Sequence, residues 1–133
     1  MRRLTILALL LLAGCSSDWT QNRDFSAQVN SVYPQNYRSE IVALMRSYLN
    51  DPVGVRGASV SEPSQRTIEG IGRYASCVRY DARKTGGQYA GSKDSMVLFR
   101  GGRLDRIMDN EFAREQCKAA NYLPFPELQQ ITR

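Results

Sequence analysis

The side chains of this chain that could carry out chemistry are mainly carboxylates, because the sequence contains no histidine. Without histidine there is no Ser-His-Asp or Cys-His nucleophile, and no zinc site of the usual catalytic kind. The carboxylates available for acid/base work in the central part of the chain are Glu62, Glu69, Asp81, Asp94, Asp105 and Asp109. Cleaving a glycosidic bond requires two carboxyl groups about 5–9 Å apart, and no spacing here fixes such a pair. We therefore predict that the chain has no catalytic residues and is not an enzyme.

Residues 86–93 (GGQYAGSK) have a glycine and lysine spacing similar to that of the phosphate-binding loop G-x-x-x-x-G-K-[ST]. Ser92 and Lys93 stand in the reverse order, however, and the segment precedes an expected strand instead of opening a helix. The lysine would miss the β- and γ-phosphates, so we expect no nucleotide binding. A glycine-rich loop between two strands explains the segment. It could still bind a ligand through charged side chains and one aromatic ring, namely Arg83, Lys84, Tyr89 and Lys93.

The N-terminus has the pattern of a secretory signal. Arg2 and Arg3 precede an apolar run over residues 4–13, and a helix of about ten residues rises only about 15 Å, half of a ~30 Å hydrocarbon core. The run ends in Leu12-Ala13-Gly14-Cys15, which resembles the lipobox of bacterial lipoproteins. The resemblance implies cleavage before Cys15 and attachment of two or three acyl chains, enough for stable anchoring. The alternatives are an ordinary signal peptide with a chance cysteine and a buried apolar helix.

The residues after the lipobox and the charge of the remaining chain bear on location and partners. In lipoproteins of enteric bacteria, an aspartate directly after the cysteine favours the inner membrane. Here Ser16 and Ser17 precede Asp18, which implies the outer membrane facing the periplasm. Without residues 1–14, 16 Lys and Arg remain against 13 Asp and Glu, for a net charge of about +3 in 119 residues, enough for one domain. This mild excess predicts no nucleic-acid binding, and fits either a solvated surface or contact with anionic headgroups, lipopolysaccharide phosphates or peptidoglycan carboxylates.

Two cysteines remain once Cys15 is acylated, namely Cys77 and Cys117. In the oxidising compartment that the resemblance implies, two thiols without a third competitor are expected to form a disulfide with each other. Closing a loop of about 40 residues could stabilise the domain by up to ~4 kcal/mol on chain-entropy grounds. The pair is too widely spaced for a Cys-x-x-Cys redox site. We therefore predict a structural bridge, and neither a metal nor a cofactor.

The segments that must position these groups begin with a polar stretch and a helix. Residues 15–35 lack a period and are expected to form a flexible tether of roughly 25 Å r.m.s. span, leaving residues 36–133 as a single domain. Apolar side chains over 37–48 recur at helical spacing. Asn36 is the expected N-cap, and Asn50-Asp51-Pro52 is expected to end the helix.

The middle of the domain predicts β structure. Strands are expected over residues 58–62, 73–83 and 95–100. Gly101-Gly102 is typical of a two-residue hairpin turn, because both residues can adopt a positive φ. Residues 103–108 should then return antiparallel, although their apolar side chains also fit a helical spacing.

The C-terminal part predicts a second helix and a packed tail. Asp109 is expected to cap a helix that runs through Ala120. If Cys77 pairs with Cys117, this helix lies on the Cys77 face of the sheet. The apolar tail over 122–126 should pack back on the body. The predicted fold class is α+β: a meander of three or four antiparallel strands, with an N-terminal and a C-terminal helix packed on one face.

Several segments resemble a group of small lipoproteins of alphaproteobacteria to which no activity is assigned. They are residues 37–49, VRGASVSEP (55–63), RYASCVRYDAR (73–83), YAGSKDSMVLFRGGRLD (89–105) and EQC with YLPFPEL near the end. The resemblance covers about residues 33–128 and implies no particular activity. A weaker similarity is to the small lipoprotein subunit of the outer-membrane barrel-assembly machinery, which also has a lipobox, a helix and strands ending in a hairpin. This chain lacks the Gly-Met-Thr-type start of that family's helix.

These observations predict a lipid-anchored protein of the cell envelope that works without catalysis. The leading hypothesis is an accessory or adaptor subunit that binds another envelope protein, held to the membrane through Cys15. The alternative is a periplasmic ligand-binding module, or an inhibitor of cell-wall-degrading enzymes, that uses the loop over residues 83–93. A cell-wall enzyme is a third hypothesis, for which the sequence offers no catalytic constellation.

Overall fold

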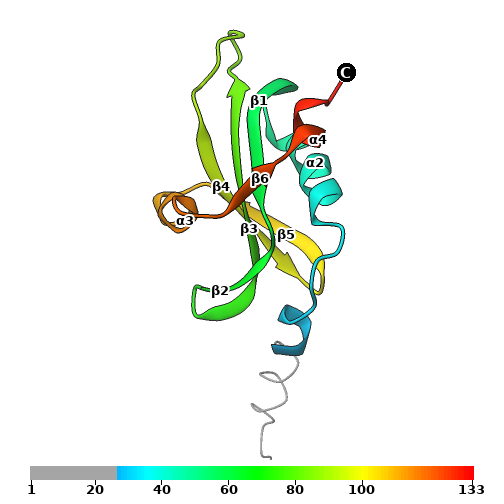
Figure 1. The fold of residues 1–133 in the computed structure, drawn as a ribbon, viewed down its shortest axis with the longest axis vertical. Coiled ribbons are helices and arrows are strands. Elements are labelled where there is room, and N and C mark those ends of the chain that lie inside the picture. Colours follow the sequence, from blue (N-terminus) through cyan, green and yellow to red (C-terminus); the bar gives the residue numbers. More distant parts are fainter. Residues whose placement is uncertain (1–26) are drawn as a thin grey trace, which may run out of the picture.

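A six-stranded antiparallel sheet forms the centre of the computed structural model, which describes residues 27–133 (Figure 1). The strands are β1 (Asp51–Ser61), β2 (Ser64–Ile68), β3 (Ile71–Arg83), β4 (Lys93–Arg100), β5 (Arg103–Met108) and β6 (Tyr122–Pro124). Their order is β5-β4-β3-β1-β6, and β2 pairs with the first half of β3. The helices are α2 (Tyr37–Tyr48), α3 (Glu111–Cys117) and α4 (Pro126–Gln129).

The α+β class is confirmed, but the sheet is larger than the three or four strands predicted. Strand β2 escaped prediction because Ile68 is its only buried side chain, so it shows no alternation of apolar residues. Strand β6 has three residues and joins the sheet by pairing with β1. Strand β1 starts well before the predicted residue 58. Its first half was missed because Gly54 and Gly57, which take positive φ, accompany shifts of its register against β3 and interrupt the strand pattern.

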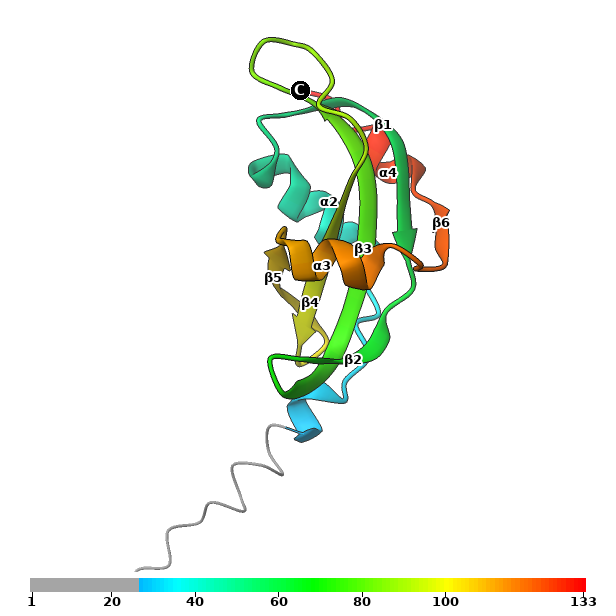
Figure 2. The same cartoon turned by 90° about the vertical axis from the view of Figure 1, so that its left-hand side faces the viewer.

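Helices cover both faces of the sheet, so the prediction that they share one face is wrong (Figures 1 and 2). Side chains alternate across β3, and Val78 and Tyr80 lie in the core under α2 and α4. Ala75 and Cys77 point to the opposite face, where α3 covers them. The disulfide places α3 on the Cys77 face as predicted, but nothing in the sequence pattern of α2 indicated which face that helix would choose.

The larger core lies between the sheet and helices α2 and α4. Ile41 and Met45 stand four residues apart on α2 and are fully buried, as the helical spacing of apolar residues predicted. Phe99 from β4 and Phe125 before α4 fill the same core. Each such side chain contributes about 1.5–3 kcal/mol by leaving water. The predicted packing of the tail is thus confirmed, since Phe125 is fully buried and its N–H donates to the Ala58 carbonyl at 3.0 Å.

The glycine hairpin between β4 and β5 forms as predicted. Gly101 and Gly102 have φ values of 59° and 75°, and β5 pairs antiparallel with β4, with one register shift between Leu98 and Phe99. The helical alternative for residues 103–108 is therefore excluded. The sequence left this strand ambiguous because the irregularity disturbs the two-residue alternation of its side chains.

The described part of the predicted tether, residues 27–35, packs on the domain. The Gly101 N–H donates to the Val29 carbonyl at 3.0 Å, and a Cβ on Gly102 would lie only 2.8 Å from Val32 Cγ1. Pro34 is buried. This stretch therefore lies against the turn of the hairpin, at the end of the sheet opposite the β3–β4 loop (Figure 2).

The second helix differs from the prediction at both of its ends. Asn110, and not Asp109, is the N-cap: its side-chain oxygen accepts from the Ala113 N–H at 2.9 Å. The helix stops at Cys117, before the predicted Ala120. At the first helix, Asn36 occupies the N-cap position as predicted, but its side chain makes no capping hydrogen bond.

Candidate functional site

Two of the three cysteines form the predicted structural bridge. Cys77 on β3 and Cys117 at the end of α3 form a disulfide with Cα atoms 5.5 Å apart, as predicted. Both residues are fully buried. The bridge ties the helix to the middle of the sheet. Cys15, the predicted lipidation site, lies outside the described residues.

The loop between β3 and β4 is held by its own backbone. The Lys84 N–H donates to the Gln88 carbonyl at 2.7 Å, and the Gly87 N–H donates back to the Lys84 carbonyl at 2.9 Å. The Ala90 N–H donates to the Ala82 carbonyl at 2.9 Å. These bonds leave a short exposed tip and prolong the ladder of the two strands. The loop is therefore an ordered extension of the sheet.

Tyr89 anchors this loop and does not project as a binding group. Its hydroxyl donates to the Gly54 carbonyl at 2.7 Å. The Arg56 guanidinium lies 3.8 Å from the centre of its ring and the Arg83 guanidinium 5.4 Å away, both within the range of cation–π attraction. Replacing Tyr89 would therefore release the loop from β1, which makes Tyr89→Ala an unsuitable test of ligand binding.

Asp81 is a second anchor that sequence reasoning missed, since it considered Asp81 only as a catalytic carboxylate. The residue is 8% exposed on β3. One carboxylate oxygen accepts from Arg56 Nε at 2.8 Å and the other from the Gly91 N–H at 2.9 Å. Asp81 therefore joins β1 to the returning arm of the loop. The only sequence signal was that Asp81 is the one acidic residue of the strand.

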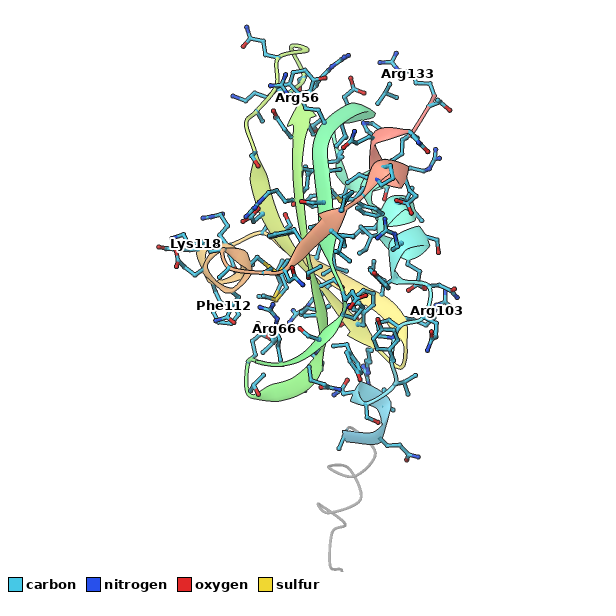
Figure 3. All side chains as sticks on the ribbon, viewed as in Figure 1. Arg56, Arg66, Arg103, Phe112, Lys118 and Arg133 are labelled. Atoms are coloured by element: carbon cyan, nitrogen blue, oxygen red, sulfur yellow. A yellow bond between two sulfur atoms is a disulfide. The ribbon has the colours of Figure 1, made fainter. Side chains whose placement is uncertain are left out.

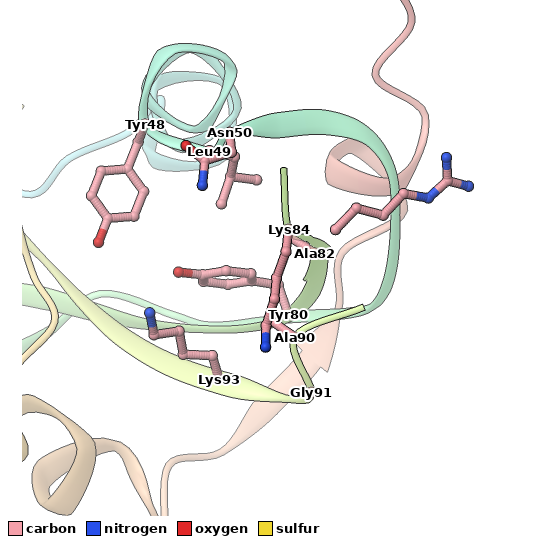
Figure 4. Close-up of a pocket in the computed structure, with 10 residues that line it drawn as sticks. Tyr48, Leu49, Asn50, Tyr80, Ala82, Lys84, Ala90, Gly91 and Lys93 are labelled. Atoms are coloured by element: carbon pink, nitrogen blue, oxygen red, sulfur yellow. The ribbon is translucent and has the colours of Figure 1, made fainter. Parts of the chain in front are cut away.

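A hollow of about 390 Å³ lies between the C-terminal end of α2 and the β3–β4 loop (Figure 4). We call it the tyrosine hollow; it is lined by Tyr48, Leu49, Asn50, Tyr80, Ala82, Arg83, Lys84, Ala90, Gly91 and Lys93. Three of the four predicted binding residues, Arg83, Lys84 and Lys93, are thus brought together here. Tyr89 is not part of its wall. The tyrosines and the helix end could not be assigned from sequence, because they join the site only through packing.

Of the three cations that line the tyrosine hollow, Lys93 is paired with Asp109. Lys93 Nζ lies 2.8 Å from Asp109 Oδ2, and the Tyr48 hydroxyl donates to the same oxygen at 3.2 Å. The bond to Asp109 raises the pKa of Lys93, so its ammonium stays charged. Burial, and then the charge of Asp109, raise the pKa of Tyr48 to about 12. Burial also raises the pKa of Tyr80. Both phenols are therefore neutral at physiological pH.

Most of the carboxylates considered as acid/base groups are paired with cations. Five of the six carboxylates considered above, all except Glu62, form salt bridges with arginine or lysine. Over residues 27–133, no group of three or more His, Cys, Asp or Glu side chains is placed to hold a metal ion. Within the same span, none of the helices has the length and apolar character that crossing a bilayer requires.

No family model, curated protein sequence or solved structure matches this chain. Function is therefore argued from the site itself. In the tyrosine hollow, apolar walls lie beside two phenol hydroxyls and one ammonium group. The Tyr48 hydroxyl and the Lys93 ammonium are bonded to Asp109, and the buried Tyr80 hydroxyl is bonded to Ser95 Oγ at 3.2 Å. Figure 4 shows that the hydroxyls of Tyr48 and Tyr80 and the amine of Lys93 lie on the same side of it. Such a set can hold a ligand or a partner's side chain by hydrogen bonds and charge.

Proposed function

We propose that the protein is a non-enzymatic adaptor of the bacterial cell envelope, anchored by lipid on Cys15 to the outer membrane facing the periplasm, that binds another envelope protein. The anchor is supported by the Leu-Ala-Gly-Cys sequence after a short apolar run, and the membrane by Ser16 and Ser17. Adaptors need an ordered surface and no catalytic groups. The surface that fits this role lies beside the tyrosine hollow.

The observation that carries the adaptor proposal is two exposed aromatic side chains, one bonded to Asp109 and the other three residues after it in the chain. Tyr48 at the end of α2 is 40% exposed and donates to Asp109, and Phe112 in the first turn of α3 is 43% exposed. Lys93 and Arg114 both pair with Asp109 and are half-exposed, with Arg114 Nη1 at 3.7 Å. We call this set, Tyr48, Lys93, Asp109, Phe112 and Arg114, the aromatic edge.

The aromatic edge has the composition of a protein-binding surface. Aromatic and arginine side chains dominate the binding energy of protein interfaces, with polar groups around them. Phe112 projects from the lower side of α3 in the view of Figure 3, and this helix is tied to the sheet by the Cys77–Cys117 bridge. The ion pairs to Asp109 hold Lys93 and Arg114 in place before binding, which lowers the entropy lost when a partner docks. The partner should present an apolar recess flanked by carboxylates.

Cross-linking in cells tests the adaptor proposal. Full-length protein is cross-linked, purified from solubilised membranes and its partners identified, with Cys15→Ala to test the anchor. Phe112→Ala should reduce recovery of the partner at least tenfold, because a central aromatic anchor is lost. Leu123→Ala is the matched control, since Leu123 is 38% exposed but lies on β6. If as much partner is recovered with Phe112→Ala as with Leu123→Ala, the aromatic edge is ruled out. If every partner is still recovered with Cys15→Ala, the anchored adaptor is ruled out.

The tyrosine hollow supports a second function, a periplasmic ligand-binding or enzyme-inhibitor module that uses residues 83–93. The supporting observation is that three loop cations line a hollow with two tyrosines. Inhibition of a purified muramidase is the direct assay. Ala90→Trp should fill the hollow and abolish inhibition, whereas Gln88→Trp, on the same loop but outside the hollow, should not. No inhibition by the unaltered protein would exclude the inhibitor function.

A further inference from the structure

A second depression adjoins the tyrosine hollow at the end of the sheet farthest from residue 27. It has a volume of about 960 Å³ and lies between the β3–β4 loop, the start of β1 and the last residues of the chain, which Figure 1 shows at the same end of the domain. We call it the basic groove; it is lined by Arg46, Asn50, Asp51, Pro52, Val53, Arg83, Lys84, Thr85, Gly86, Gly87, Ile131, Thr132 and Arg133. Arg83 and Lys84 line both depressions.

The side chains of the basic groove carry an excess of positive charge. Asp51 is its one carboxylate side chain, and it already lies 3.9 Å from Arg133. In residues 27–133, the side chains of Arg46, Arg83 and Lys84 form no salt bridge. Three cations therefore face one depression without a carboxylate to balance them, and they raise the local concentration of anions.

One of these cations is held in position by the fold. A Cβ on Gly54 would lie 2.9 Å from Arg83 Nη2, so the guanidinium packs against the backbone at Gly54. Gly54 has a φ of 74°, which also favours glycine. The nearby Tyr89 hydroxyl raises the pKa of Arg83, which stays charged at any physiological pH. The fork of Arg83 is thus oriented before a ligand arrives.

The tip of the loop adds backbone donors to these cations. Among the described residues, the N–H groups of Thr85 and Gly86 donate to no protein acceptor, whereas those of Lys84 and Gly87 close the turn. Successive free N–H groups next to cationic side chains are the elements of an anion-binding loop. The Thr85 side chain is exposed at the same place.

We propose that the basic groove binds a ligand that carries phosphate groups. The inference rests on the second function proposed above, because it assigns a ligand class to the loop over residues 83–93. A phosphate monoester has two charges and several acceptor oxygens, and guanidinium forks bind it in bidentate fashion. A single carboxylate would leave two of the three cations unbalanced. Within the described chain no aromatic side chain lines the groove, so it lacks the anchors that a protein partner would use.

Titration of the lipidated full-length protein in non-ionic detergent tests the proposal, with sodium tripolyphosphate as the probe. Calorimetry should show saturable one-to-one binding that weakens steeply as ionic strength rises. Arg46→Ala/Lys84→Ala should weaken binding at least tenfold. The matched control is Arg100→Ala/Lys118→Ala, which removes two exposed cations that do not line the groove and should change affinity less than twofold. Unchanged thermal midpoints confirm that every variant folds.

The outcomes separate this proposal from the others. No saturable binding, equal binding by the two double variants, or binding of pentaglutamate as tight as that of tripolyphosphate overturns it. The source of the phosphate is identified with Cys15→Ser protein and phosphatidylcholine vesicles that contain phosphatidic acid. Groove-dependent sedimentation with these vesicles indicates a lipid headgroup, and binding of tripolyphosphate alone indicates a soluble ligand; both support the proposal. Failure here leaves the tyrosine hollow standing if Ala90→Trp still abolishes inhibition.

Discussion

Replacing Asp81 tests whether one buried carboxylate holds the β3–β4 loop in its binding position. Asp81→Ala removes the acceptor of the Gly91 N–H and of Arg56 Nε. Arg56 is 61% exposed, so solvent screens the ion pair and its loss costs only about 0–1 kcal/mol. An N–H that loses its acceptor costs about 1–3 kcal/mol when it is buried, and Gly91 is exposed, so the lower end applies. The expected loss in the free energy of unfolding is about 1–2 kcal/mol.

Asp81→Asn separates the two contributions. An amide oxygen can still accept from the Gly91 N–H, whereas the charge that pairs with Arg56 is gone. We expect Asp81→Asn to cost less than about 1 kcal/mol. Urea unfolding gives the free energies, and hydrogen exchange of the Gly91 amide reports the bond directly. Gly91 should lose its protection in Asp81→Ala and keep it in Asp81→Asn.

Glu69→Gln is the control for a general effect of losing a carboxylate. Glu69 lies at the opposite end of β3 from the loop and pairs with Arg106, and both side chains are exposed (62% and 47%). It should cost less than about 1 kcal/mol and leave Gly91 protected. The reasoning is refuted if Gly91 stays protected in Asp81→Ala. It is also refuted if the alanine and asparagine variants lose the same stability, since the Gly91 bond would then contribute nothing.

Three further predictions concern the body of the domain. Cys77→Ala/Cys117→Ala should lower the free energy of unfolding by up to about 4 kcal/mol and raise the urea m-value, because the unfolded chain is no longer constrained; an unchanged m-value in urea unfolding contradicts this. Burial raises the pKa of Tyr48 and of Tyr122 from 10.0 to about 12, so the folded state binds more protons than the unfolded state between these values. The contribution of these two tyrosines to stability should therefore be constant below pH 10 and fall as the pH rises toward 12. An ultraviolet titration of the native protein in which every tyrosine ionises near pH 10 would disprove it. Phe125→Ala should cost about 3–5 kcal/mol, because the ring is fully buried; thermal unfolding with a midpoint close to that of the unaltered protein would show that the tail does not belong to the core.

Local patterns in the sequence predicted the parts of the fold that local chemistry decides. The alternation along residues 73–83 gave β3, and its two faces were assigned as the structure has them. Gly101-Gly102 gave the hairpin because two adjacent glycines tolerate the positive φ of its turn. The spacing of Ile41 and Met45 gave α2. Each of these signals lies within a few residues of the element that it specifies.

The rest depended on contacts between residues far apart in the chain. The face chosen by α2 follows from how Phe125 and α4 fill the core, 77 or more residues beyond Tyr48. Asp109 was assigned as a cap, but Asn110 takes that position because Asp109 is paired with Lys93, 16 residues earlier. Tyr89 anchors the loop because its hydroxyl donates to the carbonyl of Gly54, 35 residues earlier. No local period encodes any of these pairs.

The proposed surfaces can be tested independently, because different residues carry them. Phe112 belongs to the aromatic edge alone, and Arg46 belongs to the basic groove alone. Loss of a protein partner with Phe112→Ala and retention of it with Arg46→Ala/Lys84→Ala would place the partner on α3. The reverse result would place an acidic protein partner on the basic groove. It would contradict both the aromatic edge as the protein-binding surface and phosphate as the ligand of the groove. Because Lys84 also lines the tyrosine hollow, Arg46→Ala by itself decides between hollow and groove: it should weaken tripolyphosphate binding and leave inhibition of a muramidase unchanged.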